Sequence, residues 1–234
     1  NTTGCQNTAL GQNVMYTNVS GDFNTAVGRE ALYSNTTADS NTALGYSAMK
    51  LNTTGGANTA VGAFALDSNT TGYANVAIGC DALQSNTEGF HNVAVGENSL
   101  ELNTTGDQNV AIGVTALRAN TASNNTAIGF SALKCNTSGT YNTALGTLAL
   151  DANITTNSNT AIGYAALGVN VASNNTAVGT SSLDANTTGT TNVAVGVAAL
   201  GANTTASSNT AVGASALSLN TTGATNTAVG FQSL

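Results

Sequence analysis

The residues that could carry out chemistry in this 234-residue chain are few and scattered. His91 is the only histidine, and the three cysteines are Cys5, Cys80 and Cys135. General acid–base catalysis needs titratable side chains held close together, and zinc sites need several Cys or His ligands at short spacing. His91 has no second histidine and no cysteine at ligand spacing. We therefore expect no enzyme activity, no metal site and no cofactor.

The charge content narrows the function classes further. Only 6% of the residues are charged, and four Lys and Arg against eleven Asp and Glu give a net charge of −7. Nucleic-acid binding rests on cationic contacts, so nucleic acid is not an expected partner. No apolar run is long enough for a membrane-spanning helix, so we expect no membrane insertion. The chain opens at NTTGCQ without a signal-peptide pattern, and this favours a mature, processed or excised chain.

The whole sequence is built from one short repeat. The motif NTAVG and its variants recur 17 residues apart, except for two intervals of 16 that follow Asn109 and Asn159. The consensus is N-T-A-V-G-x-x-A-L-x-x-N-T-T-G-x-x, and its positions are numbered 1 to 17 below. A period near twenty suits a solenoid. We predict an all-β, parallel β-solenoid (β-roll) of about 14 coils over residues 1–234, one repeat array without an internal domain boundary or evident caps.

The columns of the aligned repeats predict a cross-section. Positions 2 to 4 form one strand, and positions 8 to 11 form a second, with positions 9 and 11 inside and position 10 outside. Position 10 carries Lys50, Asp67 and Arg118, which agrees with a solvated site. Gly at position 5 in every copy supplies a positive φ or a close backbone approach. The turn after position 12 contains both one-residue deletions, because turns tolerate them.

Two unvaried asparagine columns are expected to be structural. Asn carries donors and acceptors on one side chain, so stacked copies can hydrogen-bond along the coil axis and to backbone groups. The predicted ladders at positions 1 and 12 include Asn24, Asn41, Asn58, Asn75, Asn35, Asn52, Asn69 and Asn103.

The first strand is apolar on both faces, whichever face points inward. If positions 2 and 4 point inward, the unvaried Ala column points outward; if Ala points inward, the Val/Ile/Leu column points outward. A strand covered on both sides normally has a second layer over it, although Ala could also simply make a tight wall. We predict that the Ala column is a self-association stripe that includes Ala26, Ala43, Ala60, Ala77, Ala94, Ala111, Ala127 and Ala144.

The motifs NVAIG (residues 75–79 and 109–113) and NVAVG (residues 92–96 and 192–196) resemble the head repeats of trimeric autotransporter adhesins. The longer pattern NTAxGxxALxxNTTG is similar to repeats of tail-fibre-like bacterial and viral proteins. The resemblance covers essentially the whole chain through one short motif. It implies a left-handed β-roll packed as a trimer, located outside the cell or on a virion, with an adhesive or spacer role.

The expected function is therefore that of a structural extracellular fibre segment. Its expected partner is itself, as a trimer or a head-to-tail filament, with a host-surface glycan or protein as a further partner. A carbohydrate-binding solenoid is the alternative, but the eleven Phe and Tyr form no full column. Ice binding is a third hypothesis, weakened because the Thr column at position 13 exchanges with Val19, Ile154 and Val171. The three cysteines occupy different columns and are expected to be isolated thiols, with an interchain bond as the other option.

Overall fold

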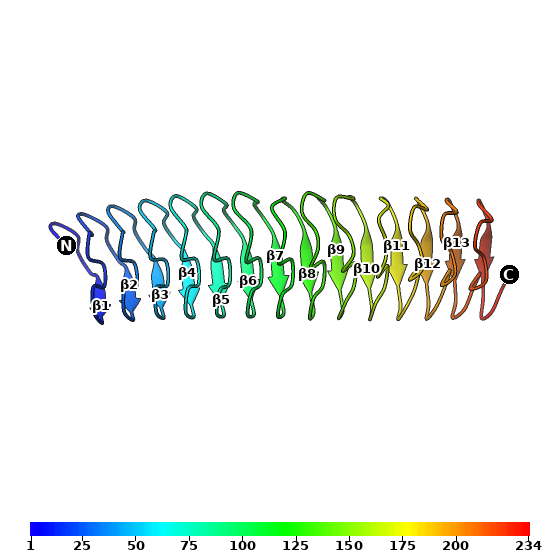
Figure 1. Cartoon of the computed structure of the whole chain (residues 1–234), viewed down its shortest axis with the longest axis horizontal. Coiled ribbons are helices and arrows are strands. Elements are labelled where there is room, and N and C mark those ends of the chain that lie inside the picture. The colour runs from blue at the N-terminus through cyan, green and yellow to red at the C-terminus, as the bar shows by residue number, and fades with distance from the viewer. The chain divides into compact units, whose positions relative to one another are not determined.

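The structure, a computed structural model, describes residues 1–234 and contains only short parallel strands joined by turns (Figure 1). It divides into two compact units, Asn1–Ser123 (unit 1) and Asn124–Leu234 (unit 2). Unit 1 contains seven strands, which are β1 (Thr8–Leu10), β2 (Thr25–Val27), β3 (Thr42–Leu44), β4 (Thr59–Val61), β5 (Val76–Ile78), β6 (Val93–Val95) and β7 (Val110–Ile112). Unit 2 contains seven more, which are β8 (Thr126–Ile128), β9 (Thr143–Leu145), β10 (Thr160–Ile162), β11 (Thr176–Val178), β12 (Val193–Val195), β13 (Thr210–Val212) and β14 (Thr227–Val229).

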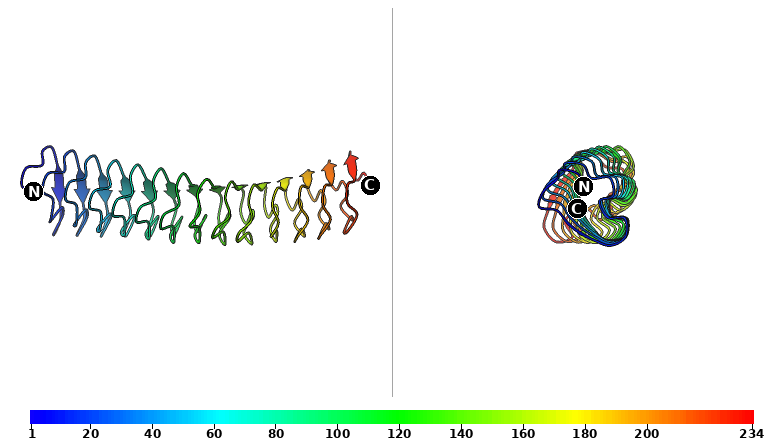
Figure 2. Two further views of the ribbon diagram at one scale, coloured as in Figure 1. Left: turned by 90° about the horizontal axis from the view of Figure 1, so that it is seen from above. Right: turned by 90° about the vertical axis from the view of Figure 1, so that its left-hand side faces the viewer.

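Within each unit, every strand pairs in parallel with the strand one repeat away. In β2 and β3, Thr25 pairs with Thr42 and Ala26 with Ala43, so equivalent repeat positions lie side by side. Each repeat therefore makes one closed coil, as the view along the coil axis shows (Figure 2). The predicted all-β parallel solenoid with 17 residues per coil is confirmed.

The predicted second strand at positions 8 to 11 is wrong. These residues form a turn, in which Glu30 at position 7 and Leu32 at position 9 have left-handed φ angles of 61° and 49°. The left-handed residues curl the chain, so that the adjacent Ala31 and Leu32 both point into the core. Position 11 points outward instead, and Leu51 there is 44% exposed. The alternation of a strand therefore does not apply to this segment.

The turn segment still stacks on its neighbours through the backbone. Leu32 donates its N–H to the carbonyl of Ala48 in the next coil at 3.0 Å, and Met49 donates to Ala65 at 2.9 Å. A left-handed conformation costs an L-residue roughly 1–2 kcal/mol. These axial hydrogen bonds and the burial of the position-9 side chain offset that cost in every coil.

The glycine at position 5 serves both predicted purposes. Gly45 has φ = +145°, a conformation that L side chains rarely adopt. A Cβ at Gly45 would also lie 2.3 Å from the carbonyl oxygen of Gly62 in the next coil. The corner after the strand is thus closed to any side chain.

The core of each coil is thin, because it holds only one large side chain. Position 9 supplies Leu or Met, while positions 3 and 8 supply small residues such as Ala77 and Ala82, which are fully buried.

Changing Leu83 to Ala should destabilise unit 1 by about 2–5 kcal/mol, because neighbouring coils cannot close the cavity. Urea unfolding would measure the change, with Thr71→Ala on the exposed turn as the control. Equal losses for the two variants would contradict this description of the core.

Candidate interaction surface

The position-12 asparagines form a continuous side-chain ladder over most of each unit. Asn52 donates from Nδ2 to Asn35 Oδ1 at 3.1 Å and to the carbonyl of Gly55 at 2.9 Å. Asn69 repeats the arrangement one coil on, donating to Asn52 at 2.8 Å. Asn35, Asn52, Asn69 and Asn103 are all fully buried. These predicted ladder residues therefore bond along the coil axis.

The position-1 asparagines form a second ladder of a different kind. The backbone N–H of Asn41 donates to Asn24 Oδ1 at 2.9 Å, and Asn41 Nδ2 donates to the carbonyl of Gly55 at 2.9 Å. The Gly55 carbonyl thus accepts one hydrogen bond from each ladder. Asn58 and Asn75 continue the same arrangement. Each coil is consequently tied to the next through both buried columns.

The two shortened coils interrupt the position-12 ladder. Asn103 Oδ1, which precedes the first of them, is buried without a hydrogen-bond partner. In unit 2, Asn153 Oδ1 instead accepts the hydroxyl of Thr156, while Asn170 donates to its own turn at Ala172, 2.7 Å away. Asn186 still donates to Asn170 Oδ1 at 2.7 Å across a 16-residue interval, so in unit 2 the ladder is broken before the shortened turn and continues after it.

The predicted self-association stripe is wrong in its choice of column. The unvaried alanines at position 3 point into the core and are fully buried; they include Ala26, Ala43, Ala60, Ala77, Ala94, Ala111, Ala127 and Ala144. The small side chain is needed because position 3 faces the Leu or Met of position 9 across a thin interior. The same strands turn positions 2 and 4 outward. The outward apolar column is therefore made by those positions and not by the alanines.

We name the outward side chains of positions 2 and 4 the strand face. Position 2 is Thr or Val and position 4 is Val, Ile or Leu in all 14 copies, so this face carries no charge. Leu44 is 46% exposed and Ile78 is 40% exposed. The sequence signal that could have identified the strand face was the aliphatic position-4 column, which is apolar although it does not fill the core.

The charged and aromatic side chains of unit 1 gather mainly at positions 6, 7 and 10. Lys50 lies 2.8 Å from Glu30, and Arg29 lies 3.2 Å from the same carboxylate. The hydrogen bond from Lys50 lowers the pKa of Glu30, and the reciprocal bond raises the pKa of Lys50. Arg29 also lies 5.7 Å from the centre of the Tyr46 ring. This surface is solvated and partly paired.

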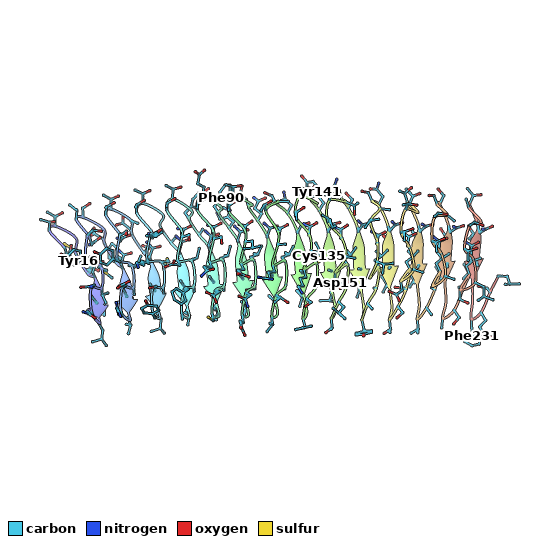
Figure 3. The ribbon with its side chains drawn as sticks, viewed as in Figure 1. Tyr16, Phe90, Cys135, Tyr141, Asp151 and Phe231 are labelled. Atoms are coloured by element: carbon cyan, nitrogen blue, oxygen red, sulfur yellow. The ribbon has the colours of Figure 1, made fainter.

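Two carboxyl groups of position 10 are partly desolvated. Burial raises the pKa of Asp67 and, in unit 2, that of Asp151, which is labelled in Figure 3. Asp67 Oδ1 is also buried without a hydrogen-bond partner. Neither carboxyl group belongs to a cluster of three or more His, Cys, Asp or Glu side chains that could hold a metal ion.

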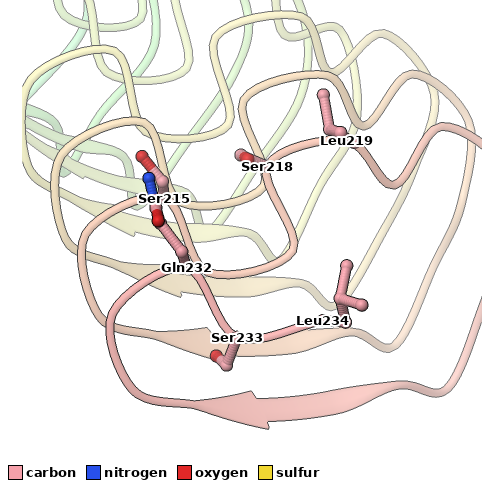
Figure 4. A pocket seen from close by; sticks show the side chains of 6 residues that line it. All are labelled: Ser215, Ser218, Leu219, Gln232, Ser233 and Leu234. Atoms are coloured by element: carbon pink, nitrogen blue, oxygen red, sulfur yellow. The ribbon is translucent and has the colours of Figure 1, made fainter.

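The cysteines and the cavity beside the last coil offer no reactive arrangement. Cys5, Cys80 and Cys135 are exposed and not joined in disulfides. A hydrogen bond to Asp81 raises the pKa of the Cys80 thiol, which lowers its thiolate fraction. A cavity of about 250 Å³ beside the last coil is lined by Ser, Gln and Leu side chains without a titratable group (Figure 4). No helix long and apolar enough to cross a membrane is present.

Changing Asn69 to Asp should destabilise unit 1 at neutral pH by about 3–5 kcal/mol, because an uncompensated charge would be buried in the ladder. The carboxylate could no longer donate to Asn52 Oδ1 or to the Gly72 carbonyl. Burial raises the folded-state pKa of such an acid, so stability should recover as the pH falls and the group protonates. Urea unfolding at pH 7 and pH 3 would measure this. The control is Thr54→Asp on the exposed turn, in the column where Glu88 occurs, and a variant as stable as that control would contradict the ladder.

Changing Asp67 to Ser should stabilise the protein at neutral pH. The variant removes a desolvated carboxylate and its unpartnered oxygen, worth about 1 kcal/mol or roughly 2–4 °C in melting temperature. Because the folded pKa of Asp67 is raised, its carboxyl group is tolerated at low pH and destabilises the fold as the pH rises through that pKa. The gain should therefore shrink at acidic pH. Asp184→Ser, in the same column, is the comparison in thermal melts, and a lower melting temperature for Asp67→Ser would refute the interpretation.

Searches of protein-family models, curated proteins and solved structures find no match to this chain. The geometry of the coils and the chemistry of their surfaces are therefore the basis on which a function can be assigned.

Proposed function

We propose that this chain is a structural segment of an extracellular fibre or filament, which associates with further copies of itself through the strand face. It would act on a cell or virion surface as an adhesin or a spacer. The chemistry found in the coils supports a structural role, because the buried polar groups are nearly all used in hydrogen bonds within and between coils.

The observation that carries the proposal is the strand face. It is uncharged in all 14 repeats, whereas positions 6, 7 and 10 of the same coils carry eleven of the fifteen charged residues of the chain. Partly exposed aliphatic side chains such as Leu44, Ile78 and Ile112 recur along it. Contiguous apolar surface of this kind marks an interaction site.

A second copy of the chain is the occupant that fits this face best. The side chains of equivalent positions recur at the strand spacing of about 4.8 Å, and only a partner with the same repeat can match every row. Two sheet faces can interdigitate their side chains at about 10 Å separation. Homo-oligomers are also the commonest assemblies of soluble proteins. The trimer implied by the adhesin resemblance would cover the face.

One observation favours a second candidate function, ice binding. Position 2 turns Thr25 and Thr42 outward beside the aliphatic position-4 column, which makes ranks of hydroxyl and methyl groups on the strand face. The rank is not continuous, since Val76, Val93 and Val110 replace Thr in three successive coils. Thermal hysteresis of a monomeric sample would favour this function over self-association.

Sedimentation with mass measurement tests the proposal. The double variant Ile78→Lys and Ile112→Lys places two charges on the strand face of unit 1. It should weaken association by at least about 100-fold, because burying an unpaired charge costs about 3–5 kcal/mol. The matched control is Gln84→Lys, at position 10, where Lys50 and Lys134 occur naturally. Circular dichroism should show an unchanged fold in both variants.

Wild-type protein that remains strictly monomeric at micromolar concentration would overturn the proposal. Equal association by the double variant and the wild type would also overturn it, since the strand face would then not be the contact.

A further inference from the structure

The outer turns of unit 1 bring together three rings that the association of copies does not use. Tyr73 and Phe90 occupy position 16 of successive coils, and their rings stack with centroids 4.9 Å apart and planes 6° apart. His91 lies edge-on to both rings, at centroid distances of 5.4 Å from Tyr73 and 5.2 Å from Phe90. Phe90 lies at the turn end of its coil (Figure 3). Phe90 therefore covers one face of the Tyr73 ring, and His91 packs against the ring edge-on.

The coil before Tyr73 leaves the other face of its ring uncovered. Position 16 of that coil is Gly56, between Gly55 and Ala57. A Cβ at Gly56 would contact only the backbone of Asp39, with O at 3.2 Å and N at 3.9 Å, and would touch no side chain. Tyr73 is 44% exposed. One coil of small residues thus forms the floor of a notch, and the Tyr73 ring forms one of its walls.

The opposite wall is polar and carries no positive charge. It is made by Asp39 and Ser40, both exposed, in the coil before Gly56. Asp39 Oδ1 accepts the N–H of Asp22 at 2.7 Å, so this carboxylate is turned toward the preceding coil. The Ser40 hydroxyl and the Tyr73 phenol remain as hydrogen-bonding groups around the notch.

An exposed aromatic ring beside hydroxyl groups, without a nearby cation, favours a sugar as the ligand. The negative face of an aromatic ring attracts the partly positive hydrogens of C–H groups, and a hexopyranose presents several such hydrogens on one side and hydroxyls around its edge. The notch is one coil wide, about 4.8 Å on each side of Gly56, which suits a single sugar ring. A nucleotide would also stack, but all four Lys and Arg lie at positions 6 and 10, away from this turn, so its phosphate would have no cation.

We propose that Tyr73, above the floor of Gly56 and supported by Phe90 and His91, is a subsite for a neutral β-linked hexopyranose such as a β-galactoside or β-glucoside. A shallow site for one ring binds weakly, with a dissociation constant on the order of 1 mM. A fibre that displays many copies of the chain would raise the overall avidity without a new contact. The subsite lies outside the strand face, so it does not depend on how the copies associate.

Saturation-transfer NMR with methyl β-D-galactopyranoside and methyl β-D-glucopyranoside tests the subsite. At least one of the two glycosides should receive saturation from wild-type protein, and Tyr73→Ala should reduce its binding at least tenfold. Gly56→Thr should do the same by filling the floor. That variant is expected to fold, because Thr140 and Thr190 occupy the same column in unit 2. Tyr141→Ala, which removes an exposed tyrosine outside the notch, is the control and should bind normally.

Absence of binding by the wild type to both glycosides would overturn the proposal, and so would unchanged binding by Gly56→Thr. The Ile78→Lys and Ile112→Lys variant separates the two proposals, because it should lose self-association and keep glycoside binding.

Discussion

The whole structure depends on one constraint, namely that the buried polar groups of a coil must be hydrogen-bonded, in large part to the neighbouring coil along the axis. The strands satisfy it through in-register parallel pairing. The turns satisfy it through backbone bonds such as that from Leu32 to Ala48. The asparagines satisfy it through two buried ladders that meet at one carbonyl in each coil. Buried polar groups are costly unless they are bonded, so a coil is stable only between coils of the same shape.

This constraint explains the unusual backbone. Three non-glycine residues in a typical coil adopt left-handed conformations, as Glu30, Leu32 and Ser40 do in the coil of β2. A single chain segment would not hold such conformations, because each is sterically disfavoured. The stacked coils over-determine them by fixing the N–H and C=O directions on both sides. The turn tolerates a missing residue at the cost of one hydrogen bond, since Asn103 Oδ1 in unit 1 is left without a partner.

The constraint also divides the surface into parts with different freedom. Positions 1, 3, 5, 9 and 12 are fixed by the interior, the ladders or the corner, and they hardly vary among the copies. The strand face is restricted to β-branched and aliphatic residues, as a covered sheet would be. Positions 6, 7, 10 and 16 are free to differ from coil to coil. Side chains that differ from coil to coil, such as those of the Tyr73 stack or the Glu30 ion pairs, are therefore confined to the turns.

The sequence by itself determined the architecture. The 17-residue period, the two Asn columns and the glycine corner predict a parallel solenoid with axial ladders, because identical residues at identical positions can bond only to their own copies. The tertiary structure decided which side of each strand faces inward. Alanine and the aliphatic column are both apolar, and a three-residue strand has too short an alternation to separate them. Only the left-handed turn at positions 7 and 9, whose φ angles follow from stacking and not from local sequence preference, sends the Leu of position 9 against Ala and leaves the aliphatic column outside.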